Sequence, residues 1–221
     1  MSLPILYSLR NCPFAMRARI AIYRSQLPIE LREVNLKNKP ERMIEASPKA
    51  TVPTLVLTSN HVIDESLDVM LWALKESDPD DLFQSITLGA PAQRQQNILS
   101  LINLFDAEFK GHLEQYKCAK RYHETNLEAC RKTCEQYIQN LEERLSSHTF
   151  LIDDNESLAD IALLPFIRQF AKVERQWYLT SPYPLVKKWL NQYLQSAMFT
   201  KVMAKYPLWS EGSEVSMFSG K

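Results

Sequence analysis

Residues 10–15 read Arg-Asn-Cys-Pro-Phe-Ala, and they join a short apolar run at 4–8 to a helical pattern at 13–24. Proline is favoured at the first position of a helix, where the amide hydrogen that it lacks would have no partner, so we expect a helix to begin at Pro13. Cys12 then lies at the N-terminus of this helix, where unpaired amides and the helix dipole stabilise a thiolate. The stretch therefore predicts a strand, a turn that carries a reactive thiol, and a helix.

Two interpretations of Cys12 are open from this stretch. A lone cysteine is commonly a small buried hydrophobic residue, whereas a Cys-Pro-aromatic triplet at a strand-to-helix turn favours a nucleophile. A redox motif of two cysteines would have its second thiol at position 15, which is Ala15. Cys12 therefore cannot close a local disulfide, and a mixed disulfide formed on it must be resolved by an outside thiol.

The first part of the chain alternates short β-like runs with helical ones, and its predicted order is βαβαββα. Two strands joined through a helix pair in parallel, and a hairpin around Ser59-Asn60 adds antiparallel pairing. We therefore predict an α/β domain over residues 1–77. Its strands are expected at 4–8, 29–34, 54–57 and 61–63, and its helices at 13–24, 40–46 and 66–75.

Only helical patterns follow in the second part of the chain. A Ser-Asp-Pro-Asp-Asp stretch interrupts the first pattern and predicts a linker over 78–90, followed by an all-α domain over 91–221. Ser157 and Asp160 have the spacing of a capping box, and the residues after Trp209 are expected to form a loose tail. The helices are expected at 91–116, 124–146, 161–171, 184–194 and 199–206.

The composition of the 221 residues, 45% hydrophobic and 24% charged, is typical of a soluble globular protein. The 26 basic and 26 acidic residues balance, so charge offers no reason to expect nucleic acid or an anionic membrane as a partner. The N-terminal residues do not resemble a signal peptide, and the apolar stretch at 161–167 is too short to span a bilayer. We therefore expect a cytoplasmic protein whose cysteines stay reduced.

The other three cysteines, Cys118, Cys130 and Cys134, are irregularly spaced, which argues against a secreted disulfide scaffold. Cys130 and Cys134 share one face of a predicted helix. His123 precedes them, but the spacing matches no standard zinc pattern. We therefore expect these residues in the core or at an interface, and no metal cofactor.

Three further segments fit a peptide-like ligand with charged ends. Val52-Pro53 precedes a strand, and a cis bond there would leave the Val52 backbone open to strand-like pairing; the alternative is a proline that starts an edge strand. Glu65-Ser66 lies at a helix start and can hold an ammonium group and a carboxylate, or serve as an ordinary cap. Lys39 can neutralise a second carboxylate, or be a solvated surface lysine.

Together these segments resemble a glutathione transferase, most closely the omega class and its bacterial omega-like relatives. The resemblance covers nearly the whole chain, and it depends on the joint order and spacing of the motifs. They are the active-site turn at 7–15, the lysine-bearing segment at 35–41, Val52-Pro53, Glu65-Ser66 and the capping box at 157–160.

The resemblance implies a thioredoxin-like domain followed by an all-α domain, usually in a homodimer. Glutathione would be the cosubstrate, and the acceptor would be a small electrophile or a disulfide. The chain departs from the family at Ala50, where a glycine is common, so a positive φ there would be strained. The implied roles are Cys12 as nucleophile, Phe14 lining the cleft, Lys39 at the glycyl carboxylate, Val52 and Pro53 at the peptide backbone, Glu65 and Ser66 at the γ-glutamyl end, and Tyr116 and Trp177 in the acceptor cleft.

Two alternatives compete with a Cys12-dependent thiol transferase with dehydroascorbate-reductase-like activity. In tyrosine-type transferases a tyrosine near the end of the first strand activates glutathione for conjugation, and Tyr7 lies close to that place. The same architecture also includes non-enzymatic proteins, such as stress regulators that bind RNA polymerase and chloride-channel-like proteins. Retention of Cys12, Lys39 and Glu65-Ser66 argues against the polymerase-binding type.

Overall fold

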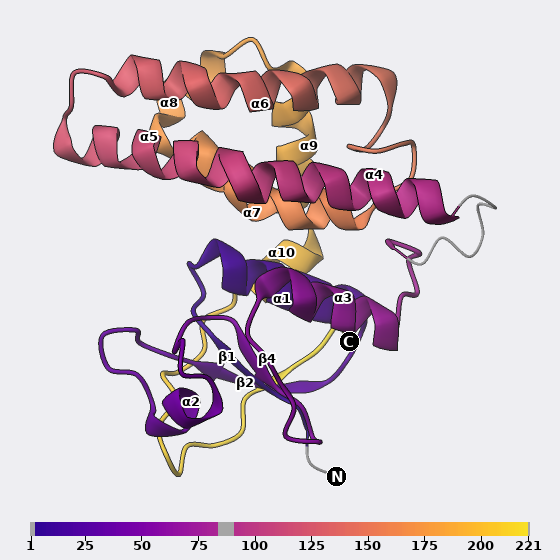
Figure 1. The fold of residues 1–221 in the computed structure, drawn as a ribbon, viewed down its shortest axis with the longest axis vertical. Coiled ribbons are helices and arrows are strands. Elements are labelled where there is room, and N and C mark those ends of the chain that lie inside the picture. Colours follow the sequence, from indigo (N-terminus) through magenta and orange to yellow (C-terminus); the bar gives the residue numbers. More distant parts are fainter. Residues whose placement is uncertain (1–2, 84–90, 221) are drawn as a thin grey trace. The chain divides into compact units, whose positions relative to one another are not determined.

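The computed structural model describes residues 3–83 and 91–220, and the chain divides into two compact units (Figure 1). One unit is Met1–Asp80 together with Ser196–Lys221, and the other is Asp81–Gln195. The first unit contains the sheet and three helices before Asp80, and the second is helical. The predicted fold class, an α/β domain followed by helices, is confirmed.

The units divide the chain differently from the predicted domains at 1–77 and 91–221. Residues from Ser196 onward lie with the α/β unit and not with the helices that precede them. Most of the predicted linker at 78–90 falls on residues 84–90, which lie outside the described residues. The difference arises because the C-terminal segment pairs with an edge of the sheet.

The sheet has the strand order β4-β3-β1-β2-β5. Its central strand β1 pairs in parallel with β2, and β3 pairs antiparallel with β4, as predicted from the helical crossover and the hairpin. β1 also pairs antiparallel with β3, which the sequence did not predict. The bounds are β1 Ile5–Ser8, β2 Ile29–Glu33, β3 Thr54–Val56, β4 Val62–Ile63 and β5 Met217–Phe218, with helices α1 Pro13–Arg24, α2 Glu41–Ala46 and α3 Ser66–Glu76.

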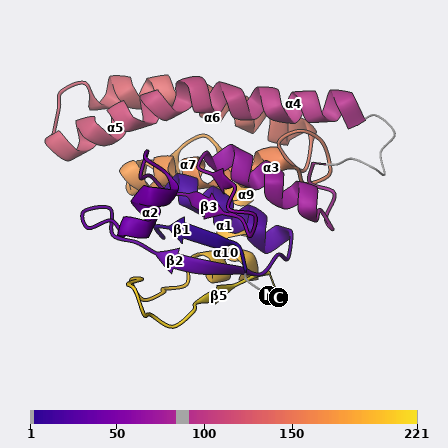
Figure 2. The ribbon, with the colours of Figure 1, turned by 60° about the horizontal axis from the view of Figure 1, so that its bottom comes forward.

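The residues after Trp209 do not form the loose tail that we predicted. β5 pairs antiparallel with β2, and Figure 2 shows this C-terminal segment, in yellow, beside β2. The Trp209 amide donates to Glu33 O (2.8 Å), and the short helix α10 (Ala197–Val202) packs against α1. An edge strand has unpaired amides and carbonyls that attract such a partner, but a pairing of two residues is too short to give a sequence pattern.

The helical unit contains one long α4–α5 segment with a π-helical turn, η1, in its middle. The buried Phe105 and Phe109 lie at the ends of that turn. Among the described residues, no helix is long and apolar enough to cross a membrane. The helices are α4 Pro91–Leu104, η1 Phe105–Phe109, α5 Lys110–Tyr122, α6 Leu127–Ser147, α7 Leu158–Val173, α8 Arg175–Thr180, which the sequence did not predict, and α9 Pro184–Leu194.

The predicted capping box at the start of α7 is confirmed, with Ser157 and Asp160 bonding reciprocally. The fully buried Asp160 carboxylate accepts from the amides of Ser157 and Leu151, from the Ser157 hydroxyl and from Trp189 Nε1, at 2.8–3.0 Å. Burial raises the pKa of Asp160 to about 6, although these four donors act in the opposite direction. The carboxylate thus ties the start of α7 to the preceding loop and to α9.

Candidate active site around Cys12

Cys12 is the N-cap residue of α1, with Pro13 in the first turn of that helix as predicted. Its backbone is extended (φ −75°, ψ 124°), and its carbonyl accepts from the Met16 amide at 2.9 Å. The half-buried side chain does not cap the helix, and Sγ lies 3.8 Å from Val52 O, to which the thiol donates. The thiol therefore lies at a helix N-terminus and beside the loop that was expected to bind a peptide.

The Val52-Pro53 bond is cis, which is one of the two alternatives that the sequence left open. Ala50, two residues earlier, has a φ of +47° and is buried, so the glycine that the family favours is replaced where the backbone is left-handed. The loop is closed by the Ala50 amide, which donates to Ser47 O (2.8 Å), and by the Thr54 hydroxyl, which donates to Thr51 O (2.7 Å). These bonds hold the Val52 carbonyl in place opposite Cys12.

Tyr7, the competitor of Cys12, is a core residue with only 2% of its surface exposed. Its hydroxyl accepts from Arg32 Nη1 at 2.8 Å, and its ring meets Trp209 edge to face. The Arg32 guanidinium also lies 4.2 Å from the centre of the Trp209 ring. The Tyr7 hydroxyl is thus bonded inside the unit, whereas the Cys12 thiol is partly exposed.

Positive charge near the active-site turn is partly neutralised by a carboxylate of β2. Arg19 is fully buried and pairs with the Glu33 carboxylate, so its charge is neutralised there. The other Glu33 oxygen accepts from the Arg10 amide at 2.7 Å, within the active-site turn. Arg19 also donates to Ser8 Oγ at 2.7 Å. Glu33 was missed from the sequence because a buried pair between distant residues leaves no local pattern.

Glu65 and Ser66 lie at the start of α3, with Glu65 as N-cap and the buried Ser66 as the first helical residue. The Glu65 side chain does not cap the helix but accepts from Lys49 Nζ at 2.8 Å. Lys49 also donates to Asp64 Oδ1 at 2.9 Å. The start of α3 therefore combines first-turn amides, which can bind a carboxylate, with a carboxylate that can bind an ammonium group.

Lys39 lies in the loop before α2 and lines a pocket of about 230 Å³. The pocket is shared with the C-terminal segment, which contributes Trp209 and Ser210, and Arg42 pairs with Glu211 beside it (2.8 Å). A carboxylate next to Lys39 would therefore have a partly enclosed place to bind.

Tyr116 and Trp177, the predicted acceptor-cleft residues, take part in the packing of the helical unit. Tyr116 is fully buried, and its hydroxyl donates to Glu174 Oε2 at 2.9 Å. Burial and the Glu174 carboxylate raise the pKa of Tyr116. Trp177 lies under the Arg131 guanidinium at 4.6 Å, and Arg131 pairs with the same Glu174 (2.7 Å). One polar network therefore engages both aromatic residues.

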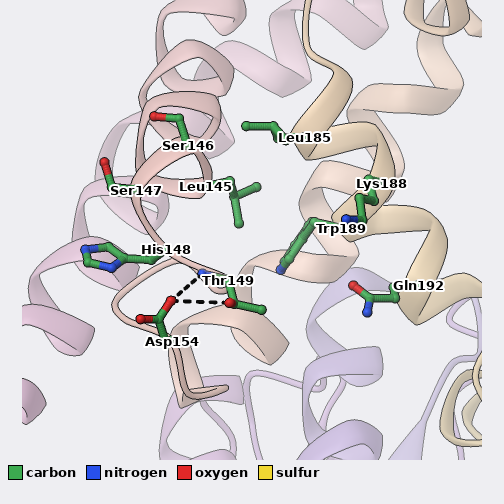
Figure 3. Close-up of a pocket in the computed structure, with 10 residues that line it drawn as sticks. All are labelled: Leu145, Ser146, Ser147, His148, Thr149, Asp154, Leu185, Lys188, Trp189 and Gln192. Atoms are coloured by element: carbon green, nitrogen blue, oxygen red, sulfur yellow. Dashed lines mark hydrogen bonds between the residues drawn. The ribbon is translucent and has the colours of Figure 1, made fainter.

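A second pocket, of about 360 Å³, lies in the helical unit between the end of α6 and α9 (Figure 3). Asp154 on its floor accepts from the amide and the hydroxyl of Thr149 at 2.9 and 3.2 Å. Trp189 donates its ring N–H to Asp160. The pocket contains none of the residues predicted for the site, and several of its polar side chains bond within the protein.

The remaining cysteines do not form a second thiol centre. Cys134 is buried, and burial raises its pKa to about 12, so it stays protonated. Cys118 and Cys130 are half-buried on helices. Within residues 3–83 and 91–220, no three His, Cys, Asp or Glu side chains are grouped so as to hold a metal ion.

Both units of the chain resemble domains of known proteins. The chain matches the family models "Glutathione S-transferase, N-terminal domain" over residues 6–81 and "Glutathione S-transferase, C-terminal domain" over residues 104–197. Mouse glutathione S-transferase omega-1 is 26% identical over 84% of this chain and 74% of its own length. Arabidopsis thaliana glutathione S-transferase DHAR3 is 23% identical over 89% and 70%.

Drosophila melanogaster pyrimidodiazepine synthase is 32% identical over 50% of this chain and 48% of its own. Among solved structures, a Pseudomonas fluorescens glutathione transferase family member with two glutathione molecules bound has a TM-score of 0.77 at 16% identity, covering 91% of this chain and 92% of that one. Populus trichocarpa glutathione transferase F7 has a TM-score of 0.76 at 18% identity, over 92% of this chain and 100% of that one. These similarities agree with the observed fold.

Proposed function

Because the chain belongs to the glutathione S-transferase family, with omega-class proteins among its relatives, we propose that it is a glutathione-dependent thiol transferase with Cys12 as nucleophile. The observation that carries the proposal is the position of Cys12 at the N-terminus of α1, half-exposed and 3.8 Å from Val52 O. A thiolate there is stabilised by first-turn amides, and Tyr7 has no comparable access to a ligand.

The reaction proceeds as two exchanges at Cys12. The thiolate attacks the glutathionyl sulfur of a mixed disulfide, the acceptor leaves as its thiolate, and a Cys12–glutathione disulfide forms. The thiolate of a second glutathione attacks the glutathionyl sulfur of this disulfide, which releases oxidised glutathione and restores the Cys12 thiolate. The second exchange requires glutathione because Ala15 offers no resolving thiol.

The ligand roles are assigned to residues around the thiol. Val52 would pair through its backbone with the cysteinyl part of glutathione, and the cis Pro53 leaves that backbone open. Lys39 would neutralise the glycyl carboxylate. Glu65 would hold the γ-glutamyl ammonium, and Ser66 with the first amides of α3 would hold the γ-glutamyl carboxylate. Phe14 would line the adjoining acceptor side.

Replacement of each sulfur-activating candidate tests the assignment. Cys12→Ala should lower thiol transfer from glutathione to hydroxyethyl disulfide at least about a hundredfold, because the nucleophile is lost. Tyr7→Phe should retain most of that activity in the folded fraction. The reverse pattern would assign the chemistry to Tyr7 and favour conjugation to electrophiles. Mass spectrometry should show a glutathione adduct on the wild type and none on Cys12→Ala.

The non-enzymatic alternative predicts neither glutathione binding nor disulfide reduction. A protein that neither binds glutathione resin nor reduces hydroxyethyl disulfide under reducing conditions would be an interaction protein built on this fold.

Our proposal includes a homodimer, as is usual in the family, and a reducing cytosolic location that keeps Cys12 a thiol. Light scattering tests the first of these, and imaging of the tagged protein in its native cell tests the second.

A further inference from the structure

Lys49 binds the Glu65 carboxylate, to which the proposed function assigns the ammonium group of glutathione. Lys49 Nζ lies 2.8 Å from Glu65 Oε1 and 2.9 Å from Asp64 Oδ1. The Lys49 and Glu65 side chains are 53% and 67% exposed, whereas Asp64 is 24% exposed. The second Asp64 oxygen accepts from Ser47 Oγ at 2.6 Å. Asp64 is therefore the fixed partner of the lysine, and Glu65 is the exposed one.

The Lys49 side chain and the γ-glutamyl end of glutathione both present an ammonium group with three donors. Both cannot occupy the same position on Glu65. We propose that Lys49 is an intramolecular competitor for the γ-glutamyl ammonium of glutathione, and that it weakens glutathione binding by holding Glu65 in the free protein. The inference rests on the proposed function, since it requires glutathione to bind with its ammonium group at Glu65.

The arrangement allows Lys49 to release Glu65 without losing its charge partner. Hydrogen bonds from Ser47 and Lys49 lower the pKa of Asp64, so its carboxylate is ionised at neutral pH and can retain the lysine. Glutathione binding then exchanges one exposed ion pair on Glu65 for another. Exposed pairs are weak, so the competition should change the dissociation constant of glutathione by about two- to fivefold.

The first test measures S-methylglutathione, whose blocked sulfur does not react with Cys12, by isothermal titration calorimetry on the full-length protein. Lys49→Met removes the competing charge but keeps a side chain of similar length, and should lower the dissociation constant about two- to fivefold. Lys49→Arg keeps the cation and should not tighten binding. Lys75→Met, a control at another exposed lysine, on α3, should leave the dissociation constant unchanged.

A matched ligand isolates the ammonium group. The S-methylated glutaryl analogue, in which hydrogen replaces the α-amino group, has no cation to compete with Lys49. The gain from Lys49→Met should therefore disappear with this ligand. Because the unmasked Glu65 attracts the ammonium through an exposed charge, the gain with S-methylglutathione should also shrink as salt is raised from 0.01 to about 1 M.

The outcomes separate this inference from the proposed function. If Glu65→Gln weakens S-methylglutathione binding while Lys49→Met leaves it unchanged or weakens it, the competitor role is overturned and the proposed site stands. Weaker binding by Lys49→Met would instead identify the lysine as a ligand of the γ-glutamyl carboxylate. If Glu65→Gln has no effect, or the wild type does not bind, the proposed γ-glutamyl site fails and the competitor role fails with it.

Discussion

The helices α1 and α7 both begin at a small polar or thiol residue that follows an extended backbone, but their N-termini are completed differently. At α7, Ser157 and Asp160 form a reciprocal capping box inside the core, and every Asp160 oxygen accepts hydrogen bonds. At α1, the Cys12 side chain does not cap the helix and lies half-exposed beside Val52. The start of α3 resembles that of α1, because Glu65 binds Lys49 and not the helix amides.

The difference shows how one structural element serves stability in one place and binding in another. First-turn amides lack intrahelical partners, so they are satisfied either by the protein or by something that binds to it. A buried capping box uses them for stability. An uncapped, half-exposed N-terminus keeps them available for a thiolate or a ligand carboxylate, at some loss of stability.

The largest expected effect is at the capped N-terminus of α7. Asp160→Asn should lower the free energy of unfolding by about 3–5 kcal/mol, because its NH2 group would face either the Ser157 amide or the Leu151 amide and the Trp189 ring N–H, which are donors themselves. Urea unfolding monitored by circular dichroism measures the change. Asp154→Asn, on an exposed loop, is the control and should cost less than about 1 kcal/mol. Equal losses would contradict the structural importance of the capping box.

The next effect concerns the buried Arg19–Glu33 pair beside the N-terminus of α1. Glu33→Gln should lower the free energy of unfolding by about 2–3 kcal/mol, because it leaves the buried Arg19 guanidinium without a carboxylate. It also weakens the bond to the Arg10 amide in the active-site turn. Glu211→Gln, which removes only the exposed pair with Arg42, is the control and should cost less than about 1 kcal/mol. Thermal or urea unfolding of the two variants measures both losses. A Glu33→Gln protein as stable as wild type would refute the stabilising role of the Arg19–Glu33 pair.

A smaller effect is expected from adding a capping side chain at the uncapped N-terminus of α1. Cys12→Ser places a good capping oxygen at the start of α1 and should raise the free energy of unfolding by about 0.5–1 kcal/mol. The same change should abolish thiol transfer. Cys118→Ser, within α5, is the matched control and should give no such gain. Stabilisation without loss of activity would disprove the proposed conflict between capping and catalysis at this position.

The smallest effect lies in the loop opposite Cys12. Ala50→Gly should raise the free energy of unfolding by about 0.5 kcal/mol, because relief of the left-handed alanine exceeds the entropy that glycine adds to the unfolded chain. Ala73→Gly, in the interior of α3, should instead lower it by about 1 kcal/mol or more. Differential scanning calorimetry can measure both variants. If both lose stability alike, the strain at Ala50 is refuted.

The sequence predicted local features well and distant contacts poorly. Pro13, the Ser157–Asp160 spacing and Val52-Pro53 are short patterns whose geometry depends on neighbouring residues, and the structure confirms each of them. The bonding of Arg19 to Glu33 could not be foreseen, because no local pattern shows which distant carboxylate a buried arginine contacts. The assignment of residues to ligand roles stays a prediction for the experiments above.

The sequence by itself determined the βαβαββα order of residues 1–77, the place of Cys12 at a helix start and the absence of a resolving thiol at position 15. These follow from backbone preferences of proline, from residue periodicity and from residue identity. Only the tertiary structure decided that Tyr7 is bonded to Arg32, that the C-terminal segment completes the sheet at β2, and that Lys49 holds Glu65. Such contacts join residues far apart in the chain, and their free energy depends on burial and geometry that exist only after folding.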